Sequence, residues 1–205
     1  MIIIGICGAS GSGKTSMAEA LREKLQPYAV AVLSMDDYYY DCSTLSAEEK
    51  AKRNFNHPNS IDVALLYRHI MECKKGKAIH KPQYDHASCT RLRSTISIQL
   101  PDILIVEGLL LLYFPALRAL LDLKIFIDSN PVLCRERVIA RDMLERGKTR
   151  EEVMMRLKTV VEPMYRRYVR PLLFFADIII SAKECLNKEN IFRIAKKILT
   201  LKKNI

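Results

Sequence analysis

The sequence has no apolar run long enough to cross a lipid bilayer. Its longest apolar segments are "IIIGIC" at 2–7 and "LLLLYF" at 109–114. Both are far shorter than the roughly 20 residues that a transmembrane helix needs. No basic segment precedes the first apolar run, so we expect no signal peptide. These absences predict a cytoplasmic protein with no membrane partner.

Closely spaced cysteine pairs are also absent. The six cysteines are scattered, and no two of them have the C-x-x-C spacing that is typical of zinc sites and redox dithiols. We therefore expect mostly buried, free thiols in a reducing compartment. The sequence matches no RRM, KH or zinc-finger pattern, and aromatic residues are rarely interleaved with basic ones. This predicts that the protein has no nucleic-acid partner.

Basic residues exceed acidic ones. The chain of 205 residues has a net charge of +10, and 49% of its residues are hydrophobic, as in an ordinary globular protein. Much of the excess charge lies in "CRERVIARDMLERGKTR" (134–150) and "YRRYVR" (165–170). Such an excess suits either a nucleic-acid surface or a pocket for a small polyanion. Without a nucleic-acid motif, the small polyanion is the better explanation.

Apolar segments alternate with helical patterns along the chain, which indicates an α/β fold with a parallel sheet and right-handed crossovers. The continuous apolar character of most strands indicates a sheet that is covered on both faces. Residues 78–100 differ, because "TISIQL" alternates apolar and polar residues, so we expect a small antiparallel hairpin insert there. The expected strands of the main sheet are 2–7, 29–34, 102–108, 123–128 and 176–181.

Polar residues mark several helix starts. Ser46 and Glu49 form a capping-box pattern before a short helix, and Ser60 is the expected cap of the helix in "IDVALLYRHIMEC". Two arginine-rich helical patterns lie between 130 and 175 and are joined near Gly147. Further helices are expected at 14–25 and 187–203.

The segment "GASGSGKT" matches the phosphate-binding pattern G-x-x-x-x-G-K-[ST], with a strand before it and a helix after it. Its glycines allow backbone amides to turn inward around a polyphosphate, next to the positive end of a helix. Lys14 would reach the β and γ phosphates, and Thr15 would bind Mg²⁺. The alternative is a glycine-rich turn with an ordinary capping threonine. We expect ATP or GTP with Mg²⁺, held by Gly8, Ala9, Ser10, Gly11, Ser12, Gly13, Lys14, Thr15 and Ser16.

Carboxylates follow two of the expected strands, where parallel sheets gather their ligands. Glu107 ends strand 102–108 and would hold Mg²⁺; its alternative is a capping or salt-bridged carboxylate. Asp36 follows strand 29–34, one strand away from the phosphates in our expectation, and suits a general base that takes a proton from an attacking hydroxyl. Its alternative is an N-cap. Asp37 is a rival for the same role.

These motifs together resemble the uridine kinase family, within the phosphoribulokinase/uridine kinase group, along residues 1–200. The resemblance implies a P-loop NTPase-type three-layer fold in one domain, 1–205, with a hairpin insert at 78–100 and an arginine-rich helical lid at 133–170. It also implies phosphorylation of a nucleoside at its 5′-hydroxyl, and homo-oligomers. The matching segments are "GASGSGKT", "LSMDDYY", "FNHPNSID", "KPQYDHASCTR", "VEGLLLL", "IFID", "RDMLERGK", "VEPMYRRYVRP" and "FADIII".

The resemblance also implies roles for single residues. Asp36 matches the catalytic aspartate, Tyr39 and Tyr84 match positions around the nucleobase, and Thr15 and Glu107 match the metal site. Lid cations would stabilise the charge that develops on the γ-phosphate oxygens; the alternative is a solvated helix face with pairs such as Arg141–Glu145. The expected catalytic residues are Asp36, Lys14 and Arg141. Arg137 and Arg146 join the nucleotide site, and the acceptor site comprises Asp36, Tyr39, Asn56, Tyr84, Cys89, Arg141, Lys148 and Arg156.

Four positions depart from the family pattern: Asn56 replaces an aspartate, Cys89 a histidine (although His86 lies three residues earlier), Val138 an arginine and Arg156 a glutamine. Three of the four belong to the acceptor side, and none to the ATP or metal site. The leading hypothesis is a kinase that converts uridine or cytidine to UMP or CMP in pyrimidine salvage. One alternative is a related kinase for another riboside or small hydroxyl metabolite, with Arg156 binding a phosphate already on the acceptor. A second is a nucleotide-switched binding module.

Overall fold

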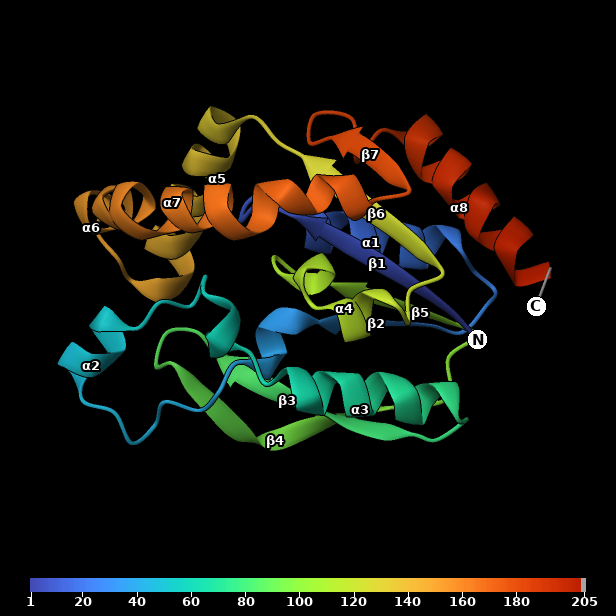
Figure 1. The fold of residues 1–205 in the computed structure, drawn as a ribbon, viewed down its shortest axis with the longest axis horizontal. Helices are drawn as coiled ribbons and strands as arrows, with labels where there is room; N and C mark the ends of the chain where they lie inside the picture. The colour runs from blue at the N-terminus through green and yellow to red at the C-terminus, as the bar shows by residue number, and fades with distance from the viewer. Residues whose placement is uncertain (204–205) are drawn as a thin grey trace.

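The computed structural model describes residues 1–203 and contains one five-stranded, parallel sheet (Figure 1). The last two residues of the predicted domain, 204–205, lie outside the described residues. The strand order is β2-β5-β1-β6-β7. The strands are β1 (Ile2–Gly8), β2 (Val30–Ser34), β5 (Ile103–Glu107), β6 (Leu123–Asp128) and β7 (Ile178–Ser181).

The strand order corrects one expectation. β5 pairs with both β1 and β2, so that Ile103 lies opposite Ile2 on one side and opposite Val30 on the other. Asp36 therefore follows a strand that is two positions from the P-loop strand, not one. Both β1 and β5 are buried along their whole length, which explains their continuous apolar sequence.

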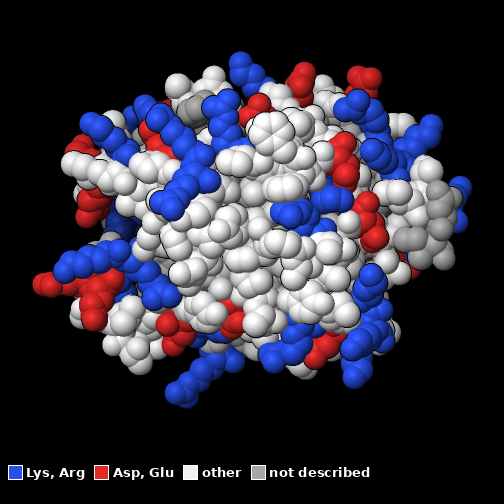
Figure 2. All heavy atoms as spheres, in the orientation of Figure 1, with Lys and Arg blue, Asp and Glu red and all other residues white. Residues whose placement is uncertain are grey.

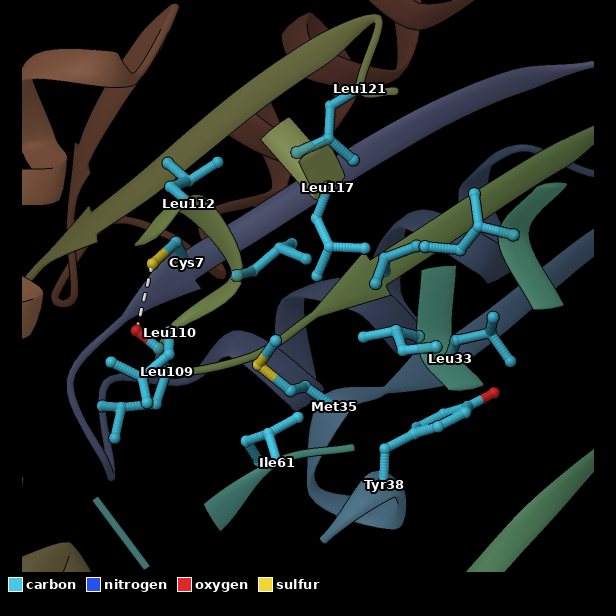
Figure 3. Packing of buried hydrophobic residues seen from close by; sticks show 14 of the residues in the cluster. Cys7, Leu33, Met35, Tyr38, Ile61, Leu109, Leu110, Leu112, Leu117 and Leu121 are labelled. Carbon is cyan, nitrogen blue, oxygen red and sulfur yellow. Dashed lines mark hydrogen bonds between the residues drawn. The ribbon is translucent and has the colours of Figure 1, made fainter. Parts of the chain in front are cut away.

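Helices cover both faces of the sheet and complete the predicted three layers. α1 (Lys14–Lys24) and α8 (Lys188–Lys203) pack on one face, where they share a core with alternate residues of β1. α3 (Val63–Lys74), α4 (Pro115–Arg118) and the 3-10 helices 111–113 and 170–175 contribute to the core on the other face. Figure 3 shows how leucines from 109–121 pack in this second core beside Met35, where the Cys7 thiol donates to the Leu109 carbonyl (3.3 Å).

Local capping agrees with the sequence at one helix and differs at another. α2 (Ala47–Lys52) begins with the predicted capping box of Ser46 and Glu49. Asp62, and not Ser60, caps α3, because its carboxylate accepts from the Leu65 amide at 3.0 Å. The Ser60 hydroxyl instead donates to the carbonyl of His57 (2.7 Å) within the 3-10 helix Pro58–Ser60.

The predicted hairpin is present as β3 (Ile79–Asp85) and β4 (Thr90–Ile98), which pair antiparallel in a sheet of their own. It lies beside α3 and the 3-10 helix Met35–Tyr38 that follows β2 (Figure 1). This contact places the hairpin next to the predicted general base.

The arginine-rich segment forms the predicted helices. α5 (Pro131–Arg146) ends at Gly147, and α6 (Arg150–Arg156) continues through α7 (Glu162–Met164) with π-helical turns at 157–161 and 165–169. Val138, Ile139, Val153 and Leu157 form a small core between α5 and the following helix.

No helix among residues 1–203 is long and apolar enough to cross a membrane. Figure 2 shows Lys and Arg in scattered groups on one face of the described chain, with Asp and Glu between them. The positive charge on this face is therefore not gathered into one band.

Candidate active site

The P-loop connects β1 to α1 with the backbone that its glycines allow. Gly8, Gly11 and Gly13 all have positive φ angles (155°, 75° and 101°), which only glycine adopts easily. The Lys14 ammonium group donates to the Ala9 carbonyl at 2.9 Å, so it folds back over the loop. Ser12 is fully buried, and its hydroxyl has no hydrogen-bond partner among the described residues. The loop thus retains polar groups for a ligand.

Helix α5 lies directly against this loop. A Cβ at Gly11 would lie 2.8 Å from the Cys134 carbonyl oxygen and 3.1 Å from a Val138 methyl group. The Arg137 guanidinium donates to the Gly11 carbonyl at 3.2 Å. Val138, which replaces an arginine of the family pattern, is therefore buried in the small core of the lid. Its neighbour Arg137 faces the predicted phosphate site.

Three oxygen-bearing side chains meet at the carboxyl ends of β1, β2 and β5. The Glu107 carboxylate accepts from the Ser34 hydroxyl (2.7 Å) and from the Thr15 hydroxyl (3.2 Å), and its residue is only 3% exposed. Burial raises the pKa of Glu107, and the positive charge of Lys14 opposes that rise. The structure thus brings together the two predicted metal-site residues and adds Ser34, which the sequence analysis missed.

This donor set fits Mg²⁺, which prefers hard oxygen ligands and takes few of them from protein. Residues 1–203 contain no group of three or more His, Cys, Asp and Glu side chains that could hold a metal ion. A hydroxyl and one carboxylate, completed by phosphate oxygens and water, match the usual way in which Mg²⁺ binds with a nucleotide.

Asp36 and Asp37 have different surroundings. Asp37 forms an ion pair with Lys81 of the hairpin. The Asp36 amide donates to the Ser34 hydroxyl (3.3 Å), which also contacts Glu107. Gly108 permits this arrangement, because a Cβ there would meet the Met35 side chain at 2.4 Å. The structure thereby distinguishes two neighbours that the sequence could not separate.

An aromatic cluster lies next to Asp36. The Tyr39 ring contacts Phe55 (5.3 Å between centroids), Tyr84 (5.5 Å) and His86 (6.1 Å). Burial raises the pKa of the Tyr39 hydroxyl, and the negative charge of Asp36 raises it further. The Tyr84 hydroxyl is buried and has no partner within the described chain. The two predicted nucleobase positions therefore do come together.

His86 belongs to this cluster, although the predicted acceptor set omits it. It packs against Tyr84 at 5.3 Å, and burial lowers its pKa, against an opposing effect of Asp36. Cys89 lies in the same hairpin turn with φ +56°, and its thiol points to the His86 carbonyl (3.8 Å). The sequence held one indication of this: His86 lies three residues before Cys89, the position at which the family pattern has a histidine.

Asn56 lies on the wall of a small cavity of about 50 Å³. The residue is buried, and its backbone N–H donates to the Asn54 side-chain oxygen at 3.0 Å. The cavity is bounded by the P-loop at Ala9 and Ser10 and by α5 at Val138, and it therefore joins an acceptor position to the nucleotide loop.

The lid cations are arranged around a carboxylate that the sequence analysis did not single out. Asp142 is 2% exposed and accepts from the Arg141 Nε (2.9 Å) and Nη2 (2.8 Å) atoms. It also forms ion pairs with Arg146 (3.4 Å) and Arg156 (3.8 Å). Arg141 is thus paired with Asp142 rather than with Glu145. Lys148 is exposed, and its backbone amide donates to the Asp142 carbonyl at 3.2 Å.

The model of the "Phosphoribulokinase / Uridine kinase family" matches residues 3–187. The chain belongs to this phosphoribulokinase/uridine kinase family. A uridine kinase of Clostridium novyi (strain NT) is 40% identical over 179 residues, covering 87% of this chain and 86% of the relative. A uridine kinase of Alkaliphilus metalliredigens (strain QYMF) is 42% identical over 179 residues, with the same coverage.

A solved member of the phosphoribulokinase/uridine kinase family supports the fold. The phosphoribulokinase from Rhodobacter spheroides superimposes with a TM-score of 0.65 at 17% identity, covering 88% of this chain and 69% of that one. The P-loop kinase architecture predicted from sequence is therefore confirmed for this family member.

Proposed function

We propose that this family member is a nucleoside kinase that transfers the γ-phosphate of ATP or GTP to the 5′-hydroxyl of uridine or cytidine, giving UMP or CMP. The related uridine kinases support the activity and the substrate class. The observation that carries the proposal is the position of Asp36, between the Ser34–Glu107 pair and the Tyr39–His86 cluster.

The nucleotide would occupy the P-loop. Backbone amides of Gly8–Thr15 and the positive end of α1 suit its phosphates, and Lys14 would turn from Ala9 toward the β and γ phosphates. Thr15 and Glu107 would hold Mg²⁺, which neutralises phosphate charge when it is bound. Ser34 would orient the Glu107 carboxylate by the hydrogen bond it already donates.

Asp36 would act as the general base. As the 5′-oxygen bonds to the γ-phosphorus, its proton passes to the Asp36 carboxylate, and the bond between the γ-phosphorus and the bridging oxygen breaks to release the nucleoside diphosphate. Lid arginines, Arg141 and Arg146 among them, would stabilise the negative charge that spreads over the γ-oxygens.

The acceptor would lie between the aromatic cluster and the cavity at Asn56. Tyr39, Tyr84 and His86 suit a nucleobase, and Asn56 suits its sugar. The related uridine kinases favour this reading over the alternative in which Arg156 binds a phosphate already on the acceptor. We further propose that residues 1–205 act as one kinase domain; the homo-oligomer and the cytoplasmic location stay predictions.

A coupled assay of ADP release tests the proposal. Purified protein with Mg²⁺ and ATP should release ADP when uridine or cytidine is added, and mass spectrometry should identify the 5′-monophosphate. The Lys14→Ala variant is the matched control and should lose this activity by a factor of about 10² or more. If no member of a broad nucleoside panel stimulates ADP release by the wild type, the proposal is wrong.

A further inference from the structure

Asp142 is the only buried acid in the lid segment 131–175, where the described side chains are otherwise rich in arginine. Its carboxylate contacts three guanidinium groups that come from two helices, Arg141 and Arg146 on α5 and Arg156 on α6. The contact to Arg141 is made by two guanidinium nitrogens on the same oxygen, which orients the group as well as neutralising it.

The main chain of the same residue fixes the next part of the lid. The Asp142 carbonyl accepts from the amides of Gly147 and Lys148, and Gly147 takes the left-handed conformation that ends α5. One residue therefore sets both the direction of three arginines and the start of the turn that carries Lys148.

The helix that carries Arg141 and Arg146 packs on the P-loop, where Arg137, one turn before Arg141, donates to the Gly11 carbonyl at 3.2 Å. Burial lowers the pKa of His86, and Arg146 and Arg141 lower it further against the opposing effect of Asp36. Arg146 is itself half-buried, and its pKa is lowered by burial and by its neighbours Arg141 and Arg156. Three mutually repelling guanidinium groups share this space only if a negative charge lies among them.

We infer that Asp142 is a positioning residue for catalysis: it gathers Arg141, Arg146 and Arg156 into one preformed cluster over the phosphate site. The inference rests on the proposed function for its kinetic test, but not for its binding test. Without the carboxylate, the three arginines would separate into solvent and would have to be reassembled by each incoming nucleotide.

The test compares Asp142→Asn with Glu145→Gln, which makes the same charge change at an exposed position of the same helix. Asp142→Asn should lower kcat by about 10- to 100-fold, as expected for misplaced groups around a reaction centre, with a smaller change in the KM of the nucleoside. Asp142→Glu, which keeps the charge, should recover part of the loss. Glu145→Gln should resemble the wild type in both parameters.

A second measurement needs no acceptor. The affinity for Mg²⁺ and a fluorescent ATP analogue should fall in Asp142→Asn and should not change in Glu145→Gln. Loss of a nearby negative charge would by itself tighten binding of a polyphosphate, so unchanged or tighter binding in Asp142→Asn overturns the inference. A kcat of Asp142→Asn within twofold of the wild type also overturns the inference.

If Asp142→Asn does not fold, the test uses Asp142→Glu together with an Arg156→Gln variant, which removes one member of the cluster. A kcat of Asp142→Glu below that of Arg156→Gln contradicts the inference. A wild type that binds ATP but phosphorylates no nucleoside contradicts the proposed function and leaves this binding test valid.

Discussion

The ammonium group of Lys81 on β3 forms an ion pair with the carboxylate of Asp37, the residue next to the proposed base Asp36. The pair ties the hairpin to the segment that follows β2, and it occupies Asp37. Asp36 is thereby left as the carboxylate beside the Tyr39 ring and the Ser34–Glu107 pair.

The two aspartates should therefore respond differently to the same substitution. Asp36→Asn should cut turnover by about 10²- to 10⁴-fold and leave ATP binding nearly intact, because it removes a general base. Asp37→Asn should keep most of the turnover and lower the free energy of unfolding by about 1–3 kcal/mol, since it leaves Lys81 without its partner. Steady-state kinetics and urea unfolding measure both effects. A larger loss of turnover in Asp37→Asn would transfer the base role to Asp37.

Glu107→Gln should raise the Mg²⁺ concentration needed for half-maximal activity by about 10- to 100-fold, because the amide cannot supply the negative charge of the ligand set. The measurement is a Mg²⁺ titration at fixed ATP. Asp102→Asn is the control, since Asp102 lies just before the other end of the same strand and loses the same charge. Equal Mg²⁺ requirements in Glu107→Gln and the wild type would exclude Glu107 from the metal site.

Gly11→Ala should impair the enzyme more than Gly76→Ala, although the two glycines have nearly the same φ (75° and 73°). Backbone strain of about 1–2 kcal/mol is common to both. A Cβ at Gly76 meets nothing within 4 Å, whereas one at Gly11 would collide with the backbone of α5 at Cys134. We expect kcat/KM to fall by at least about tenfold in Gly11→Ala alone. Equal kcat/KM in the two variants would show that α5 does not need this close approach.

The buried histidine His69 should make the protein less stable at acid pH. Its Nδ1 atom shares a hydrogen bond with the Tyr38 hydroxyl (3.0 Å), and burial lowers its pKa below the ordinary value of about 6.5. The unfolded chain therefore binds a proton more readily, and the free energy of unfolding falls as pH drops below about 6.5. Urea unfolding at pH 7.5 and 5.5 should show a smaller fall in His69→Gln than in the wild type. The exposed His80→Gln control should keep the wild-type fall, and an equal fall in all three would contradict the assignment.

Much of the fold was predictable from local patterns. The apolar runs located every strand of the sheet, and the "GASGSGKT" match located the nucleotide loop. Strand order was not predictable in this way, because apolar runs report burial and not neighbours; hence β5 was not expected between β1 and β2. The Ser60 cap was wrong because Ser60 and Asp62 are both good cap residues two positions apart. Asp62 caps the helix, while the Ser60 hydroxyl donates within the preceding 3-10 helix.

The site was predictable where a motif fixes the chemistry and less so where chain segments converge. Thr15 and Glu107 are 92 residues apart and do meet. Asp142 was not predicted, because an acid in an arginine-rich helical segment is typical of an exposed ion pair. Only the fold shows that Arg156 of the next helix also contacts it. His86 was omitted because its contact with Tyr39 joins two segments that are far apart in the sequence.

The most direct test of the central claim is a crystal structure of the protein with uridine, Mg²⁺ and a non-hydrolysable ATP analogue. The account predicts that an Asp36 carboxylate oxygen lies within about 3.2 Å of the 5′-oxygen, which in turn faces the γ-phosphorus. A complex in which the 5′-oxygen approaches Asp37 or another group, with Asp36 out of reach in the closed lid state, would contradict it.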